Sequence, residues 1–464
     1  MRRLNCALVL AAAAAVFSGG CTVGPNYKRP AINTPQAYRG ETAPATVASL
    51  GDEKWWDVFQ DPQLQALIHT ALKQNYDVRI AAARIAQAQA ELTIARGNEL
   101  PSAAAEVAGN GTRNAQSVFF GPFETSDTEL GIGFQWNLDF WGKYRRATEA
   151  ARDQLLANDW AQKQVISTLV ANVASAYFTL REEDLELQIS RQTLASDQDS
   201  LRLTQLLVDH GRTSLLDVRQ AEQLVFNASG SIQEIQKQIA EQEDFISILL
   251  GENPGDVTRG LEMTAEPHPP EVPAGLPSSL LDRRPDIREA EAGLMSANAE
   301  IGVAKAAYFP AISLTGTGGL QSIALTNLFT TPSGIWNLTA QALQPLYAGG
   351  TLKGNVRVAR AEEQQALLSY EQTIQQAFRE VSDALVAYSK DQNFQQQQQL
   401  LTNSAQDASR LSDLRYRGGA ASYLEVLDAN TRYYSAELTL AQAQLDDLLD
   451  YVQLYRALGG GWQQ

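Results

Sequence analysis

The segment ELGIGFQWNLDF, Glu129 to Phe140, alternates between apolar side chains and polar or small ones with almost no exception. Successive side chains of a strand point to opposite faces, so this pattern predicts a strand with one apolar and one polar face. The polar face would carry Gln135, Asn137 and Asp139. The apolar face would carry every second residue, namely Leu130, Ile132, Phe134, Trp136, Leu138 and Phe140.

Similar alternation follows two prolines, each of which ends a helical pattern. Pro101 precedes a weakly patterned segment, and Pro310 precedes one in which Ile312, Leu314 and Gly316 share a face. A further alternating segment, WNLTAQALQPL, begins at Trp336. Because proline disfavours helical geometry in the residue before it, the strands are expected to begin just after these positions. The sequence thus predicts β-hairpins at 102–140 and 311–347, four strands per chain.

The sequence repeats itself over most of its length. Asn75 to Pro101 aligns without gaps to Arg284 to Pro310, and Leu250-Gly251 matches Leu458-Gly459. The period of this repeat is the separation between Asn75 and Arg284, which is far too long for a solenoid. We therefore expect one structural unit used twice. The predicted first repeat spans 21–251 and the second 284–464. A proline-rich connector, 252–283, would join them.

Each repeat also contains a very long helical stretch. Tyr144 to Asp209 has neither proline nor glycine, and as a helix at ~1.5 Å per residue it would extend roughly 100 Å. Glycine and a Ser-x-x-acid pattern follow each stretch, in GRTSLLD and in GGAASYLE. These signals are typical of a helix stop followed by a capping box. They predict antiparallel helical hairpins at 144–250 and 350–458.

The N-terminus reads as a secretory signal peptide, residues 1–20. Arg2 and Arg3 form the charged region, an apolar core follows, and small residues lead to Cys21. A cysteine after Gly19-Gly20 indicates a lipoprotein whose first mature residue, Cys21, carries the lipid. The alternative is an ordinary signal peptide with an incidental cysteine. Thr22 follows Cys21 where an aspartate often retains a lipoprotein at the inner membrane, which favours the outer membrane.

Composition excludes several classes of function. A formal net charge of −16 argues against a nucleic-acid surface, which needs basic patches. The two cysteines lie at the N-terminus and the three histidines are scattered, so disulfide scaffolds, metal sites and cofactors are not expected.

Four strands per chain leave two architectures open. The first is a soluble sheet with one face against a core. The second is a membrane barrel, which must be closed, needs about 8 or more strands, and would therefore be shared among chains. The lipoprotein signal, together with helical hairpins that offer no obvious core to the sheet, favours the shared barrel.

Three segments carry a family resemblance: CTVGPNYKRP, WWDVFQDPQLQALIHTAL and LLDRRPDIREAEAGLMSANAEIGVAKAAYFPAISLTG. They resemble outer-membrane efflux lipoproteins of the TolC/OprM/NodT family, over essentially the whole mature chain. The resemblance implies an α+β homotrimer, with a twelve-stranded barrel in the outer membrane of a Gram-negative bacterium. A long α-helical barrel would continue it through the periplasm. It also implies a periplasmic adaptor and an inner-membrane pump of the resistance-nodulation-division class as partners.

The resemblance implies an exit duct that moves small toxic molecules out of the cell. A duct makes and breaks no bonds, so the expected sites are a gate and docking surfaces rather than catalytic residues. By resemblance, Glu425 and Asp428 would ring the periplasmic aperture and Tyr416 would help to tie it shut. The family's turn arginine falls on Ala421, so a closing ion pair would come from Arg415 or Arg417. The competing interpretation of Glu425 is a helix cap that the helix dipole stabilises.

The hairpin turns are the expected adaptor-docking tips: Gly211, Arg212 and Thr213 in the first half, Gly418 and Gly419 in the second. A type I protein-secretion duct is the nearest alternative, and the lipoprotein cysteine favours efflux. A periplasmic adaptor would lack two repeats with paired strands. An enzyme would need a carboxylate pair, and no pair stands out in the sequence.

Overall fold

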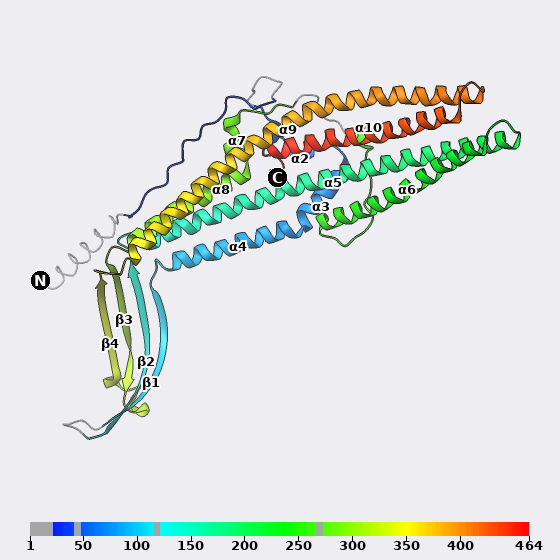
Figure 1. The fold of residues 1–464 in the computed structure, drawn as a ribbon. Helices are drawn as coiled ribbons and strands as arrows, with labels where there is room; N and C mark the ends of the chain where they lie inside the picture. The colour runs from blue at the N-terminus through cyan, green and yellow to red at the C-terminus, as the bar shows by residue number, and fades with distance from the viewer. Residues whose placement is uncertain (1–21, 41–47, 116–120, 266–271, 464) are drawn as a thin grey trace. The chain divides into compact units, whose positions relative to one another are not determined.

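The computed structural model describes residues 22–40, 48–115, 121–265 and 272–463. The predicted signal peptide and Cys21 lie outside these ranges. Within the described residues, long helices accompany four strands, which form one antiparallel sheet in the order β1-β2-β3-β4 (Figure 1). The α+β class that the sequence predicts is therefore confirmed.

Two series of elements follow one another along the chain, and their counterparts match closely in length. The helices α4 and α8 have 22 residues each, α5 and α9 have 67 each, and α6 and α10 have 36 and 35. The first series is α3 (Pro62–Gln74), α4 (Tyr76–Gly97), β1 (Ser102–Asn114), β2 (Phe123–Leu138), α5 (Lys143–Asp209) and α6 (Leu215–Leu250). The second is α7 (Pro277–Arg283), α8 (Pro285–Ala306), β3 (Ala311–Ser322), β4 (Gly334–Leu343), α9 (Thr351–Arg417) and α10 (Tyr423–Ala457).

The strands start where the prolines predicted, but β2 ends earlier than the sequence pattern suggested. Its last residue is Leu138, so Phe140 lies beyond the strand and is not one of its apolar positions. The pattern continued past Leu138 because Asp139 and Phe140 happen to alternate in polarity. Asp139 is instead used at the start of α5, where its carboxylate accepts a hydrogen bond from the Arg145 backbone N–H at 2.9 Å.

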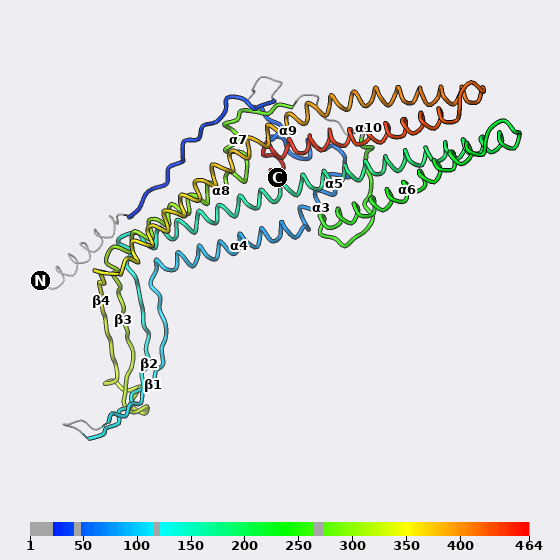
Figure 2. The backbone as a smooth tube through the Cα atoms, viewed as in Figure 1, coloured from blue at the N-terminus to red at the C-terminus, as the bar shows by residue number. Residues whose placement is uncertain are grey.

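Each long helix turns back through a left-handed glycine, at φ +67° for Gly211 and +70° for Gly419 (Figure 2). Ser214 and Ser422 are the N-cap residues of the returning helices, as predicted. The capping-box prediction itself is wrong, because neither serine side chain accepts a hydrogen bond from the helix backbone. The turns are closed through the backbone instead: the N–H groups three residues on, in Asp217 and Glu425, donate to the serine carbonyls.

The chain forms two compact units, and each takes segments from both halves of the sequence. The first holds the sheet, α8 from Glu289 onward and residues 22–31. There the N-terminal segment lies along α8: Arg29 forms a 2.9 Å ion pair with Glu291, and Gly24 packs so closely on the Gly302 backbone that it could not carry a Cβ without displacement.

The second unit contains the helical hairpins beyond residue 160 and a core of buried aromatic side chains around Phe59. Trp55, at the start of the short helix α2 (Trp55–Val58), is only 1% exposed and is therefore a packing residue of this unit. Arg284, from the RRPDI segment, is buried and forms ion pairs with Asp286 at 2.6 Å and Glu380 at 2.8 Å. This motif therefore fixes α8 against α9 within the unit.

Candidate functional site

The register of the sheet gives it one apolar and one polar face. Residues that pair directly in an antiparallel ladder point to the same side of the sheet. Phe134 pairs with Ala103 on β1 and Gly316 on β3, and Gly316 pairs with Leu338 on β4. The directly paired partners of the other apolar residues of β2 lie on this same side of the sheet. The apolar residues of this face are Ala103, Ala105, Val107, Leu130, Ile132, Phe134, Trp136, Leu138, Ile312, Leu314, Gly316, Gly318, Leu320, Trp336, Leu338, Ala340 and Ala342. Toward the far ends of β1 and β2 the same side becomes polar, with Thr128, Ser126 and the Arg113–Glu124 ion pair.

Much of this apolar face is exposed in the single chain. Trp336 is 80% exposed, Val107 75% and Ile132 63%. Soluble proteins rarely leave so large an apolar surface uncovered. The ring of Phe134 lies over Gly316, where a Cβ would approach it to 2.2 Å. The glycine on β3 therefore makes room for the large side chain on β2.

The polar face is hollowed. A hollow of about 460 Å³ is lined by polar-face residues of all four strands, among them Glu106, Gln135 and Asn337. Further along this face, Asp127 accepts hydrogen bonds from Asn110 and Gln321. Among the described strand residues, the polar face carries Glu106, Asp127 and Glu129 but no lysine or arginine.

The helix tips hold the residues expected at the gate. The first tip is the turn 210–214 between α5 and α6, and the second tip is the turn 418–422 between α9 and α10. Arg415 brings the predicted pair together, because its guanidinium lies 3.7 Å from the Glu425 carboxylate and 3.4 Å from the Ala420 carbonyl oxygen. Arg417 instead pairs with Asp413 on its own helix at 2.7 Å. Of the two candidates, Arg415 is thus the one that spans the turn.

Asp428 lies on the same side of α10 as Glu425 but has a different partner. Its carboxylate accepts a 2.9 Å hydrogen bond from Arg432, one turn later. Both side chains are well exposed, at 61% and 75%. Exposed pairs of this kind contribute only about 0.3 to 0.5 kcal/mol, so the pair leaves the carboxylate available to other charges. The Asp-x-x-x-Arg spacing in DANTR was the sequence signal for Arg432, and it was missed.

Tyr416 contacts an aromatic residue that the sequence did not single out. Its ring centroid lies 5.4 Å from that of Tyr423, and the planes are inclined at 62°. Tyr423 is only 2% exposed and packs with Ala221 of α6 and Val426 of α10. This small cluster joins the first helical hairpin to the second near their tips. Burial raises the pKa of Tyr423 to about 12, so the phenol is neutral at physiological pH.

Acidic side chains are also buried between the helices, away from the tips. Burial, with Glu186, Glu183 and Asp446 nearby, raises the pKa of Glu182 on α5 to about 8. Burial and the neighbouring Asp391 raise the pKa of Asp450 on α10, also to about 8. These carboxyl groups are therefore partly protonated at neutral pH. In the described part of the chain, no group of acidic, histidine or cysteine side chains is arranged to hold a metal ion.

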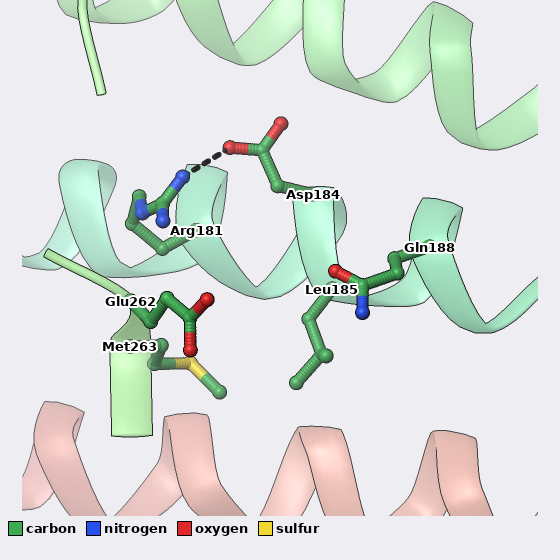
Figure 3. Close-up of a pocket in the computed structure, with 6 residues that line it drawn as sticks. All are labelled: Arg181, Asp184, Leu185, Gln188, Glu262 and Met263. Atoms are coloured by element: carbon green, nitrogen blue, oxygen red, sulfur yellow. Dashed lines mark hydrogen bonds and ion pairs between the residues drawn. The ribbon is translucent and has the colours of Figure 1, made fainter. Parts of the chain in front are cut away.

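A small pocket of about 170 Å³ lies where the proline-rich connector meets α5 (Figure 3). It is lined by Arg181, Asp184, Leu185, Gln188, Glu262 and Met263. Arg181 pairs with Asp184 at 2.8 Å and donates to the Leu261 carbonyl oxygen, and Arg259 of the connector also reaches Asp184 at 3.1 Å. These contacts fasten the connector to α5, which accounts for the polar character of the pocket.

No helix within the described ranges is both long enough and apolar enough to span a membrane.

The chain matches the family model described as outer membrane efflux protein twice, over residues 67–252 and 276–460. A probable efflux pump outer membrane protein of Pseudomonas putida, TtgC, is 36% identical over 468 residues, covering 98% of this chain and 96% of the relative. The cation efflux system protein CusC of Escherichia coli is 34% identical and covers 96% of each chain.

Solved structures agree with this. The open state of the Neisseria gonorrhoeae MtrE outer membrane channel superposes with a TM-score of 0.88 at 31% identity, covering 96% of this chain and 99% of that one. A CusC structure gives 0.87 at 32% identity, covering 95% and 100%. The matches extend over both helical hairpins and the strands between them. This chain therefore belongs to the outer membrane efflux protein family, and it is an outer-membrane component of an efflux system.

Proposed function

We propose that the chain forms a homotrimeric exit duct whose strands close a twelve-stranded barrel in the outer membrane. The observation that carries the proposal is the division of the sheet into an exposed apolar face and a hollowed polar face. Lipid would stabilise the exposed apolar face, and water would stabilise the polar face. A wall between bilayer and aqueous lumen requires this arrangement.

The strand edges support a shared barrel. β1 and β4 lie at the two edges of the sheet, where backbone N–H and C=O groups lack a neighbouring strand. In hydrocarbon each unpaired group costs several kcal/mol, so the edges must be joined to other strands. Three copies joined edge to edge would close the sheet with twelve strands.

The duct would be passive, with an inner-membrane pump of the resistance-nodulation-division class supplying the work and a periplasmic adaptor contacting the tips. Gly211, Arg212 and Thr213, with Gly418 and Gly419, would form the adaptor-docking surface. The proposed cargo is small toxic compounds, because the similar proteins are named for antibiotic, toluene and cation efflux. No bond-making residue is needed for this function.

At the periplasmic end, Glu425 and Asp428 would converge from three chains as a ring of up to six carboxylates. Their exposure, at 49% and 61%, is consistent with a position facing water. Such a ring attracts cations. Arg415, paired with Glu425, and the contact between Tyr416 and Tyr423 would hold the second tip closed, while Arg417 would act only within α9.

Cys21 would carry a lipid anchor. The residue after it, Thr22, packs against Gly142 just beyond β2, and the Val23 N–H donates to the Trp141 carbonyl oxygen at 3.0 Å. The start of the mature chain is thus fixed next to the end of a strand whose apolar face would lie in lipid.

The experiment that tests the barrel compares Phe134→Lys with Gln135→Lys, two adjacent residues of β2 on opposite faces. Lysine near the middle of a lipid-facing strand costs about 2 to 4 kcal/mol, whereas a lumen position tolerates charge. We expect outer-membrane fractionation with cross-linking to show trimer loss for Phe134→Lys only. Equal effects would contradict the orientation, and a soluble monomeric wild-type chain would contradict the channel.

The gate is tested by the conductance of the purified trimer in planar bilayers. Asp428→Asn should reduce cation selectivity and alter the closed state. Asp407→Asn, which removes an exposed carboxylate from α9, is the matched control and should change neither. Unchanged selectivity in Asp428→Asn would show that its carboxylate does not ring the aperture.

A further inference from the structure

Tyr423 fastens the second tip to the first helical hairpin. It is the first residue of α10 and would be exposed if α10 stood alone, yet it is only 2% exposed. Its ring packs with Ala221 of α6 and Val426, and Leu201 of α5 and Tyr416 of α9 cover the cluster from the sides. Four helices therefore meet at one aromatic side chain.

A buried carboxyl group lies next to this cluster. Asp197 is on α5, one helical turn before Leu201, and so lies on the same face of the helix. It is only 4% exposed. Its charge, like that of Asp217, raises the pKa of Tyr423, so the carboxyl group lies within electrostatic reach of this phenol.

We propose that Tyr423 and Asp197 form a proton-linked latch, which keeps the second tip fastened while Asp197 is protonated and releases it more readily when Asp197 is ionised. The proposal rests on the gate assignment above. It adds the two residues that set the closing strength and predicts how this strength depends on pH.

The direction of the pH effect follows from the burial of Asp197. Burial raises the pKa of this carboxyl group from 3.8 to about 6 in the fastened tip. Release of the tip returns the Asp197 carboxyl group to water, and its pKa returns to the ordinary value. The proton-bound form is therefore favoured in the fastened tip, and this stabilisation is complete below pH 3.8 and is lost as the pH rises to about 6.

The other titratable groups at the contact are the phenol of Tyr416 from α9 and the carboxylate of Asp217 at the start of α6. Asp217 accepts hydrogen bonds from the Thr213 and Ser214 hydroxyls, so its carboxylate is engaged within its own turn. Asp199 on α5 is 70% exposed and paired with Arg202.

Hydrogen exchange of the purified full-length protein tests the latch without requiring transport. Protection factors, already corrected for the intrinsic pH dependence of exchange, would be measured for the second tip and the first turns of α10 between pH 4.5 and 7.5. We expect protection to fall about tenfold per pH unit near pH 5 and to level off above pH 6, because one proton is released on opening.

Asp197→Asn should abolish this slope and keep the tip protected at pH 7, and Asp199→Asn is the matched control that should retain the slope. A wild-type tip whose protection does not change with pH would overturn the latch, as would a slope that persists in Asp197→Asn. If Asp197→Asn fails to assemble, the wild-type profile decides alone. Outer-membrane fractionation with cross-linking of the wild-type protein separates the two proposals: a soluble monomer contradicts the duct, whereas a membrane-bound trimer with a pH-independent tip contradicts only the latch.

Discussion

The two helix tips have the same backbone and different fastenings. Both turn through a left-handed glycine and begin the returning helix after a serine N-cap. The next residue is Leu215 in the first tip, which is 60% exposed, and Tyr423 in the second, which is 2% exposed. A repeated turn sequence thus specifies the shape of the turn, while one side chain decides whether the tip is attached to the neighbouring hairpin.

The acidic residues of the two tips differ in the same way. Asp217 accepts hydrogen bonds from the Thr213 and Ser214 hydroxyls and so serves its own turn. Glu425 reaches across the turn to Arg415 and remains half exposed. The first tip is therefore closed locally, whereas the second depends on contacts with other helices. This difference is the one that the proposed gate requires, in which the second hairpin moves and the first does not.

The largest expected effect comes from truncating the two residues after the N-caps. Tyr423→Ala removes a fully buried aromatic side chain, for which losses of about 3 to 5 kcal/mol are typical. Hydrogen exchange in the first turns of α10 should speed up by roughly 100-fold or more. Leu215→Ala, at the equivalent exposed position, should change exchange in α6 by less than about threefold, within the range of surface substitutions. Equal acceleration of exchange in Tyr423→Ala and Leu215→Ala would show that the two tips are fastened alike.

An intermediate and equal effect is expected at the turn glycines. Gly211→Ala and Gly419→Ala each force a Cβ into the left-handed region, which costs roughly 1 to 2 kcal/mol. Nothing lies within 4 Å of the added atom at either position, so the cost is purely conformational. Amide exchange at each turn should therefore accelerate by a similar factor of about 5 to 30. A much larger effect at one tip would mean that the two backbones are not equivalent.

The smallest expected effects on the stability of the tips come from replacing their acidic residues, Asp217 in the first tip and Glu425 in the second. Asp217→Ala removes two hydrogen bonds to a charged acceptor and should cost about 1 kcal/mol or more. Glu425→Ala removes a pair whose members are about half exposed, at 61% and 49%, which contributes at most about 1 kcal/mol. Added salt should weaken the Glu425 effect because exposed charges are screened. Exchange of the α6 and α10 N-terminal amides at low and high salt would measure both, and a larger loss for Glu425→Ala would reverse our ranking.

Much of the candidate site could be predicted because its signals are local. The two faces of β2, the turn glycines and the N-cap serines follow from spacing along the chain, whereas Glu425 and Asp428 were identified by the family resemblance of the segment after the second turn. The partner of Asp428 was also accessible, since Arg432 lies four residues later on the same helix. Tyr423 was not, because Leu215 at the equivalent position of the first repeat is exposed and nothing in the local pattern distinguishes them.

The sequence by itself determined the strand faces, the long helices and the turns, because periods of 2 and 3.6 residues and left-handed glycines act over a few neighbouring residues. Only the tertiary structure decided the register that joins four apolar faces into one, the choice of Arg415 over Arg417, and the burial of Tyr423 and Asp197. Each of these depends on which distant segment packs against a residue. Asp197 and Asp199 lie two residues apart on one helix, yet one is buried and the other exposed, because residues at this spacing point to different sides of a helix and only one of these sides is covered.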